Sequence, residues 1–404
     1  MNATSARSRP IYMDYSATTP VDPRVLAAMM PYLTENYGNA SSVHLFGQQA
    51  RAAVDNSRRQ IASLIGARPN EIVFTSGGTE ANNLAIRGLC EAAQPQGRHI
   101  ITSAIEHPSA RGPIDQLEKK GWEVTRLPVY DDGIVRVEDV RDAIRTNTVL
   151  ISVMLANNEI GTIQPVAAIG ALVCERRNDG HRNLWCHTDA VQAAGRIPID
   201  VEALGCDLLT LSAHKMYAPK GAGVLFVRRG VRLLAQNVGG HQERERRAGT
   251  EPVANLVGFG LAAELAKQEI FDRNEHTRGL RDRFESGVSQ RIEDIVFNGK
   301  RESRLSHVSN ISFRFIEGEG LLIHLDLQGV AVSTGSACSS GTLEPSPVIR
   351  ALGRDEELAR GAIRFSFGKD NTEEDVDRVL EVLPHAVESL RALSPLAPQH
   401  SVAV

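Results

Sequence analysis

The sequence predicts an α/β fold: a large domain with a mostly parallel sheet covered by helices, and then a smaller α+β domain. Three observations support this. Apolar runs of strand length alternate with longer amphipathic patterns, as in strand–helix crossover units. The alternation stops near residue 254, where a long helical pattern without a strand begins. The chain has 404 residues, of which 42% are hydrophobic, enough for two packed units.

The strand patterns of the large domain follow one another at short intervals. The first strand and its glycine turn are predicted at EIVFTSGGT (71–79), and the next helix at EANNLAIRGLCEAA (80–93). Further strands are predicted, in order, at HIITSAIEH, WEVTRLPV, TVLISVMLA, LWCHTDA, DLLTLSAHK and GVLFVR, with helices at HPSARGPIDQLEKKG, VEDVRDAIR and PVAAIGALVCERR. Since helices separate several of these strands, we expect crossover connections and parallel pairing.

The second half of the chain has a different pattern. One long helix, or two, is predicted from 253 to 288, followed by strands at HVSNISFRF, VAVST and AIRFSFG and a closing helix at EEDVDRVLEVLPHAVESLRAL. We therefore place a large domain at 11–253 and a small one at 254–391. Residues 1–10 and 392–404 are predicted to be flexible tails.

Composition excludes several classes of protein. The net charge is −4 and no long Lys/Arg run occurs, which argues against a nucleic-acid-binding face. The longest apolar stretches are strand-sized, so no membrane span is expected. The segment MNATSARSRP is not followed by an apolar run, so we see no secretory signal.

Cysteine usage predicts a reducing, cytoplasmic location. The five cysteines are an odd number without a CxxC pair, so neither a disulfide framework nor a zinc site is expected. Cys90, Cys174, Cys186 and Cys206 lie in or beside apolar patterns and are predicted to be buried structural thiols. Cys338 differs, because STGSACSSGT surrounds it only with small residues.

A cluster of motifs indicates a site for pyridoxal phosphate (PLP). Lys215 follows a strand pattern in LSAHKMYAPKGAG, where partial desolvation makes an amine nucleophilic, although most lysines are simply solvated. Asp189 ends the preceding strand pattern, and a turn of Ser76, Gly77, Gly78 and Thr79 opens a helix. Alone, that turn would be a simple helix start. A phosphate seat, a Schiff-base lysine and a carboxylate for a ring nitrogen together describe a PLP site.

The motifs also resemble a known family. In order they are YMDYSATTPVDPRV, YGNASSVHLFG, EIVFTSGGTEANNLA, EHPSA, NNEIGTIQP, HTDAVQAAG, SAHKMYAPKG, RAGTEPV and SACSSGTLEPSPVIRALG. Together they are similar to cysteine desulfurases of the NifS/IscS branch of the class V aminotransferases, from about residue 11 to 391. These enzymes are fold-type I PLP transferases. The resemblance implies conversion of L-cysteine to L-alanine, with sulfur passing to an enzyme persulfide.

The resemblance assigns roles to the cofactor-binding residues. Lys215 forms the Schiff base, Asp189 pairs with the pyridinium nitrogen, and Gln192 contacts the phenolic oxygen. His107 stacks on the ring and transfers protons. The phosphate ligands are Gly78, Thr79, Ser212 and His214, with Thr250 reaching the phosphate of the neighbouring subunit in a homodimer. A structural role is the alternative for three of these residues: a capping or surface amide for Gln192, a structural histidine for His107 and a helix cap for Thr250.

The remaining implied roles concern the substrate and its sulfur. Asn158 and Arg364 form the substrate-carboxylate clamp, although Arg364 is also placed to make a structural salt bridge. Cys338 attacks the substrate sulfur, becomes a persulfide and passes sulfur to an acceptor or iron–sulfur scaffold protein. We expect no metal site beyond a transient iron–sulfur contact at Cys338. Its SACSSG segment resembles the long-loop group of the branch.

Two departures from the family pattern concern partners. The segment 174–187 is longer than in housekeeping relatives, and the end of the chain lacks their aromatic-rich extension. The residues are therefore compatible with delivery to iron–sulfur assembly, nitrogenase maturation, cofactor synthesis or nucleic-acid thiolation. A selenocysteine lyase or a class V aminotransferase is the alternative enzyme, and a sulfur-relay subunit without catalysis is the alternative of another class.

Overall fold

A computed structural model describes residues 9–334 and 345–395. Its principal element is a seven-stranded sheet with the order β2-β8-β7-β6-β5-β3-β4. Four neighbouring pairs, β7-β6, β6-β5, β5-β3 and β3-β4, are parallel, and β8 is antiparallel to both β2 and β7. The predicted α/β fold with a mostly parallel sheet is therefore confirmed.

Each strand of this sheet lies where its sequence pattern predicts a strand. The strands are β2 (Ile72–Thr75), β3 (His99–Ser103), β4 (Glu123–Leu127), β5 (Thr148–Ser152), β6 (Trp185–Asp189), β7 (Leu208–Ser212) and β8 (Gly223–Val227). Successive residues alternate between two cores: Val224 and Phe226 of β8 pack in one hydrophobic cluster, Leu225 and Val227 in the other. Because the strands other than the edge strand β4 are buried on both faces, their sequences show continuous apolar runs rather than alternation.

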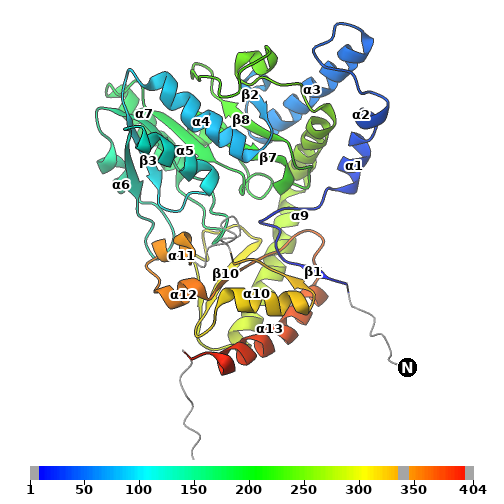
Figure 1. The fold of residues 1–404 in the computed structure, drawn as a ribbon, viewed down its shortest axis with the longest axis vertical. Coiled ribbons are helices and arrows are strands. Elements are labelled where there is room, and N and C mark those ends of the chain that lie inside the picture. Colours follow the sequence, from blue (N-terminus) through cyan, green and yellow to red (C-terminus); the bar gives the residue numbers. More distant parts are fainter. Residues whose placement is uncertain (1–8, 335–344, 396–404) are drawn as a thin grey trace, which may run out of the picture.

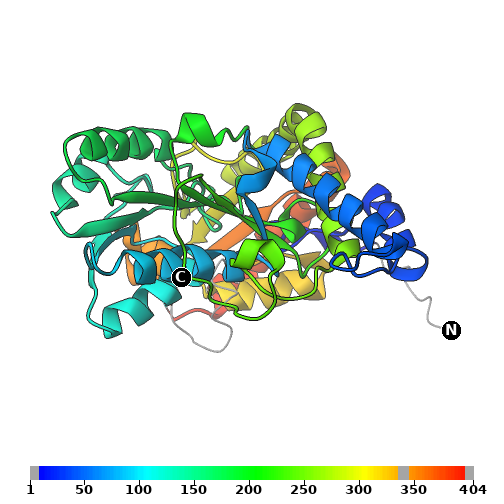
Figure 2. The ribbon, with the colours of Figure 1, turned by 90° about the horizontal axis from the view of Figure 1, so that it is seen from above.

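Helices cover both faces of this sheet, as Figure 2 shows. They are α3 (Leu45–Leu64), α4 (Gly78–Ala93), α5 (Pro108–Lys119), α6 (Val137–Ala143), α7 (Val166–Asn178) and α8 (Val201–Leu204), with α1 (Pro23–Met29) and α2 (Pro31–Thr34) at the N-terminal side. Short 3₁₀ turns are η1 (Pro69–Glu71), η2 (Ala213–Lys215) and η3 (Gln242–Glu245).

The C-terminal part forms a second, smaller layer below the first in Figure 1. It contains the antiparallel sheet β12-β10-β9. It also contains the parallel pair β1-β11, in which β1 comes from the N-terminal end of the chain. The strands are β1 (Ile11–Tyr12), β9 (Ile295–Phe297), β10 (Val308–Phe313), β11 (Val330–Ala331) and β12 (Ala362–Ser366), and the helices are α10 (Gly318–Leu327), α11 (Pro347–Ala351), α12 (Glu356–Arg360) and α13 (Glu373–Leu393).

One helix, α9 (Val253–Arg291), joins the two parts. Its first half, including Phe259, packs in the hydrophobic cluster of the large sheet, and Phe284 packs in the cluster of the small part. Ile11 and Met13, at the start of the described chain, also belong to the small cluster, because β1 pairs with β11. The domain boundary at residue 253 stays a prediction.

The structure corrects one expectation about the cysteines. Cys90, Cys186 and Cys206 are buried as predicted, but Cys174 is exposed. Val173, the preceding residue of α7, is buried, and a helix turns by about 100° per residue, so Cys174 faces away from that core. Within the described parts of the chain, no helix has the length and apolar character to cross a membrane.

Candidate active site

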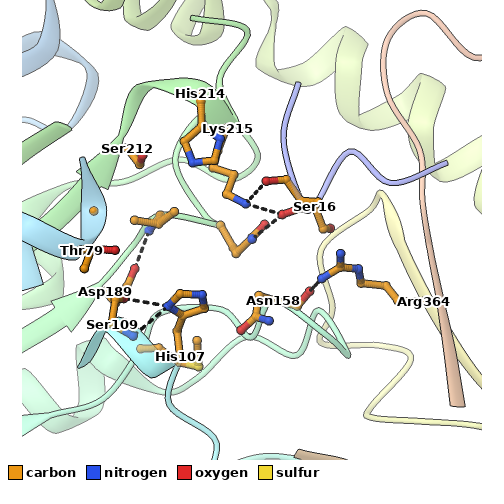
Figure 3. A pocket seen from close by; sticks show the side chains of 15 residues that line it. Ser16, Thr79, His107, Ser109, Asn158, Asp189, Ser212, His214, Lys215 and Arg364 are labelled. Atoms are coloured by element: carbon orange, nitrogen blue, oxygen red, sulfur yellow. Dashed lines mark hydrogen bonds between the residues drawn. The ribbon is translucent and has the colours of Figure 1, made fainter. Parts of the chain in front are cut away.

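The site lies where the parallel strands end. Because β2 is antiparallel to β8 and β8 to β7, β2 runs in the same direction as β7 and the other parallel strands. Their carboxyl ends therefore share one edge of the sheet, the usual ligand position in α/β folds. A pocket of about 280 Å³ opens at this edge. It is lined by Ser16, Ala17, Gly78, Thr79, His107, Ser109, Met154, Asn158, Asp189, Val191, Gln192, Ser212, His214, Lys215 and Arg364 (Figure 3).

Asp189 places a buried carboxylate at the floor of the pocket. It ends β6 and is 5% exposed. Its Oδ1 accepts a hydrogen bond from the Val191 amide (2.9 Å), and its Oδ2 accepts one from the Asn82 side chain (2.7 Å). It forms no salt bridge with any residue in the described ranges. A buried carboxylate without a cationic side chain fits a cationic ligand group.

Lys215 lies opposite this carboxylate in Figure 3. It ends the turn η2 that follows β7. Its ammonium group donates hydrogen bonds to the carbonyl oxygens of Ser16 and Ala17. The Gln192 amide also donates to the Ser16 carbonyl, at 2.9 Å. The N-terminal segment therefore fixes the amine and the glutamine side by side.

The helix start at α4 provides backbone amides for an anion. Its N-cap is Gly77, which has no side chain to satisfy the first amides of the helix. A Cβ added to Gly78 would lie 3.0 Å from Val191 Cγ2 and 3.6 Å from Ser212 Cβ, so a side chain there would fill this end of the pocket. Thr79 and Ser212 bring hydroxyl groups to the same place (Figure 3).

His214 adds an imidazole to this end of the pocket. Burial, assisted by the positive charge of Lys215, lowers the pKa of His214 to about 4. The ring is therefore neutral at pH 7, with Nδ1 3.1 Å from the hydroxyl of Thr18. An anion bound here would oppose the lowering, because a negative charge favours the protonated ring.

His107 is both a pocket residue and the N-cap of α5. Its Nδ1 accepts a hydrogen bond from the Ser109 amide (3.1 Å) and lies 2.7 Å from the Ser109 hydroxyl. Pro108 occupies the first helical position, where an N–H is not needed. Burial is the main cause that lowers the pKa of His107; Asp189 opposes it and Lys215 adds to it. The imidazole is therefore neutral near pH 7.

Arg364 and Asn158 form the far side of the pocket. Arg364 projects from β12, donates to the Asn158 carbonyl (2.8 Å) and forms a salt bridge with Asp14 (2.6 Å). Its Nε has no hydrogen-bond partner among the residues that the structure describes. The arginine thus makes the structural salt bridge and still faces the pocket.

One predicted residue lies elsewhere, and another is outside the described residues. Thr250 is exposed and does not line the pocket, and it does not cap α9, whose N-cap is Pro252. Cys338 falls in 335–344, outside the described residues. The residues beside that segment are placed: Ser333 exchanges backbone hydrogen bonds with Arg364, and the Ser346 hydroxyl donates to Glu159.

Sequence reasoning missed several residues of the site. Ser16 and Ala17 lie in the motif YMDYSATTP, and Ser109 lies in EHPSA, but nothing in either pattern marks them as pocket residues. Asn82 is fully buried within α4, and the sequence around it has an ordinary helical pattern. Their contacts connect distant parts of the chain, which a local pattern does not reveal.

Comparisons with known proteins identify the family. The family model of class-V aminotransferases matches residues 11–379. The chain belongs to this family. It is 49% identical to the cysteine desulfurase IscS of Dictyoglomus turgidum, over 96% of this chain and 97% of the relative, and 49% identical to that of Methanosarcina thermophila, over 98% and 96%. A solved NifS-like protein superposes with a TM-score of 0.88 at 35% identity, covering 94% of this chain and all of that one.

The members of this family depend on PLP, and the pocket suits that cofactor. Within the described part of the chain, the hydrogen bonds to the buried Asp189 carboxylate come from two neutral N–H groups, and the carboxylate suits a protonated ring nitrogen. The uncapped start of α4, with Gly78 in place of any side chain, suits a phosphate group. Lys215 supplies the amine. The donor set of this chain therefore fits PLP.

Proposed function

We propose that this chain is a cysteine desulfurase that converts L-cysteine to L-alanine and passes the sulfur to Cys338 and then to acceptor proteins. The observation that carries the proposal is the near-full-length identity of 49% to cysteine desulfurases, combined with one pocket that holds a lysine, a buried carboxylate and an uncapped helix start. PLP supplies an electron sink and a covalent attachment point for an amino group.

Residues of this chain hold the cofactor in the proposed site. Asp189 holds the ring nitrogen in its protonated form, and Gln192, fixed by Ser16, faces the phenolic oxygen. The amides of Gly78 and Thr79, with the Ser212 and His214 side chains, bind the phosphate. Their positions at one end of the pocket support this assignment (Figure 3).

Arg364 and Asn158 orient the substrate. The guanidinium has five N–H donors, of which the Asn158 carbonyl and Asp14 take two. The remaining donors, including Nε, which has no partner among the described residues, suit the carboxylate of cysteine. In this orientation the amino group of the substrate would face Lys215, which lines the same pocket.

Sulfur transfer balances without an external oxidant. The Cys338 thiolate forms an S–S bond to the substrate sulfur as the Cβ–S bond breaks, and the electron pair and a proton remain with the alanine product. Ser333 exchanges backbone hydrogen bonds with Arg364 and precedes Cys338 by five positions. Five residues of extended chain span up to about 17 Å. A chain of this length would allow Cys338 to approach the pocket, which supports the proposal.

The deciding experiment measures alanine from L-cysteine in the presence of a reductant. We expect the wild type to release alanine and Cys338→Ser to release none, with Cys174→Ser as the control because Cys174 is an exposed thiol that does not line the pocket. Alanine from both the wild type and Cys338→Ser would favour an enzyme that expels sulfur or selenium directly. Alanine from neither, with PLP bound, would contradict the proposal and favour an aminotransferase.

We also propose a homodimer in which Thr250 completes the neighbouring site. Thr250 is exposed, as a residue that acts across an interface must be in a single chain. Seven large apolar side chains are exposed within 26–46, an unusual concentration for a monomer surface. They are Leu26, Met30, Leu33, Tyr37, Val43, Leu45 and Phe46.

Subunit mixing tests this arrangement. A dimer of one Lys215→Ala subunit and one Thr250→Ala subunit contains one fully wild-type site only if Thr250 acts across the interface. We expect random mixing to restore about a quarter of wild-type activity, since half of the dimers are mixed and each has one intact site. No gain above the Thr250→Ala parent would show that Thr250 acts within its own subunit or not at all.

The sulfur acceptor and the cytoplasmic location remain predictions from the sequence. A sulfur-acceptor or iron–sulfur scaffold protein would take the persulfide sulfur from Cys338. Incubation of the enzyme carrying ³⁵S-labelled persulfide with a candidate acceptor, followed by non-reducing electrophoresis, would measure transfer directly. Label that stays on the enzyme would exclude that acceptor.

A further inference from the structure

Two residues outside the predicted set connect Asp189 to His107. Asn82 is fully buried in α4, and its Nδ2 donates to Asp189 Oδ2 (2.7 Å) and to Ser109 Oγ (2.8 Å). Ser109 Oγ lies 2.7 Å from His107 Nδ1. The contacts form a continuous chain between the carboxylate and the imidazole, the last of them drawn in Figure 3.

The orientation of the Asn82 amide follows from its neighbours. A carboxylate oxygen only accepts hydrogen bonds, so the group that faces Asp189 must be the Nδ2 side. Asn82 Oδ1 is then left buried without a hydrogen-bond partner among the described residues. A buried carbonyl without a partner is costly, and it marks an amide that is held for what its two N–H groups do.

The position of the imidazole proton follows in the same way. A backbone N–H is always a donor, so the Ser109 amide requires an unprotonated Nδ1 on His107. The Ser109 hydroxyl accepts from Asn82 and has its single proton for Nδ1. Both donors meet the same lone pair, so the proton of the neutral ring is on Nε2.

We propose that Asn82 and Ser109 are positioning residues that hold the Asp189 carboxylate and the His107 ring in one hydrogen-bonded unit, with the His107 proton on Nε2. This inference rests on the proposed function for its catalytic meaning, but the hydrogen-bonded unit exists in the chain itself. His107 therefore meets the substrate as a hydrogen-bond donor through Nε2, and it takes up a proton only at Nδ1, by rearranging Ser109.

The charges around the ring act from several elements. Asp189 of β6 favours protonation of His107, whereas Lys215 after β7, Arg111 of α5 and Arg364 of β12 oppose it, and burial lowers its pKa most. Removal of the Ser109 hydroxyl leaves these charges in place and takes away one donor to the neutral ring. The ring should then protonate more readily.

The test reads the ring directly by ¹⁵N NMR of the histidine-labelled holoenzyme, with His107 assigned from His107→Asn. We expect an unprotonated Nδ1 and a protonated Nε2 in the wild type. Ser109→Ala should raise the pH at which His107 titrates by about one unit, since one neutral hydrogen bond changes an equilibrium about tenfold. A protonated Nδ1 in the wild type, or an unchanged titration in Ser109→Ala, would overturn the proposal.

Asn82→Ala separates the two ends of the unit. It should raise the titration of His107 like Ser109→Ala and also shift the cofactor absorbance through Asp189, which Ser109→Ala should leave unchanged. In the double variant, His107 should titrate at no higher pH than in the more affected single variant, because both substitutions act on the same chain of hydrogen bonds. Asn56→Ala, at a polar groove on α3, is the control and should change neither signal.

A purely structural role would alter stability without moving either signal, and that result would also overturn the proposal. If Asn82→Ala does not fold, the Ser109→Ala titration still decides it. None of these measurements depends on alanine release, so a failure of the desulfurase assignment would remain distinguishable.

Discussion

Replacement of Glu106 by glutamine should change how the stability of the protein depends on pH. Glu106 lies between β3 and His107 and is 5% exposed. Its Oε1 accepts from the Ser103 hydroxyl (2.5 Å) and the Met154 amide (2.9 Å), and its Oε2 has no hydrogen-bond partner in the described chain. Burial raises the pKa of Glu106 from its ordinary 4.5 to about 8. The side chain is therefore protonated in the folded protein at neutral pH.

The sign and size of the effect follow from proton binding. Between pH 4.5 and 8 the folded protein keeps this proton while the unfolded chain loses it, so the free energy of unfolding falls as the pH rises. Glutamine keeps the accepting oxygen and does not titrate. As the pH rises from 5 to 7, the free energy of unfolding of Glu106→Gln should therefore increase by about 2–3 kcal/mol relative to that of the wild type.

Urea unfolding at several pH values measures this difference through the fluorescence of Trp122 and Trp185, which lie in or against one hydrophobic cluster. Both proteins should be saturated with PLP, because bound cofactor contributes to stability. Glu388→Gln, which removes an exposed carboxyl on α13, is the matched control and should follow the wild type. Parallel curves for Glu106→Gln and the wild type from pH 5 to 7 would refute the reasoning.

Three further substitutions test the pocket. Asp189→Asn removes the charge that holds the ring nitrogen protonated, so kcat should fall at least about a hundredfold with PLP still bound, as absorbance would show. Gly78→Ala, whose Cβ would lie 3.0 Å from Val191, should weaken PLP affinity about tenfold in titrations of apoprotein; Gly279→Ala, with open space around it, should not. Arg364→Lys should raise KM for cysteine more than it lowers kcat, because lysine lacks the planar fork. An unchanged kcat, Kd or KM, respectively, would contradict each expectation.

Most of the sheet could be predicted because all of its strands except the edge strand β4 are buried on both faces. Continuous apolar runs of four to eight residues, bounded by glycine or polar turns, favour strands over buried helices because buried helices need longer runs. The direction of β8 was not predicted, since GVLFVR has the same pattern either way. The length of the connection between β7 and β8 nevertheless indicates the direction. Residues 213–222 are too few for a parallel crossover with a helix, so β8 must be antiparallel to β7.

The pocket could be predicted where a residue follows a strand. His107, Asp189 and Lys215 come directly at or after strand ends, and parallel strands bring their carboxyl ends together. Asn82 could not be predicted in this way, because it lies inside a helix and contacts a residue 107 positions away. The pairing of Arg364 with Asp14 also depends on packing between distant segments, 350 positions apart.

His107 combines a folding role with a chemical one, and two substitutions separate them. As the N-cap of α5 it satisfies the Ser109 amide, the first N–H after Pro108. Asparagine is a good N-cap, so His107→Asn should keep the stability of the wild type, whereas His107→Ala should lose about 1 kcal/mol in urea unfolding. Both lack the ring, so alanine release should fall about a hundredfold or more in both. Near-wild-type turnover by His107→Asn would mean that the residue serves only to begin the helix, and the hydrogen bonds from Asn82 and Ser109 would then have no consequence for the reaction.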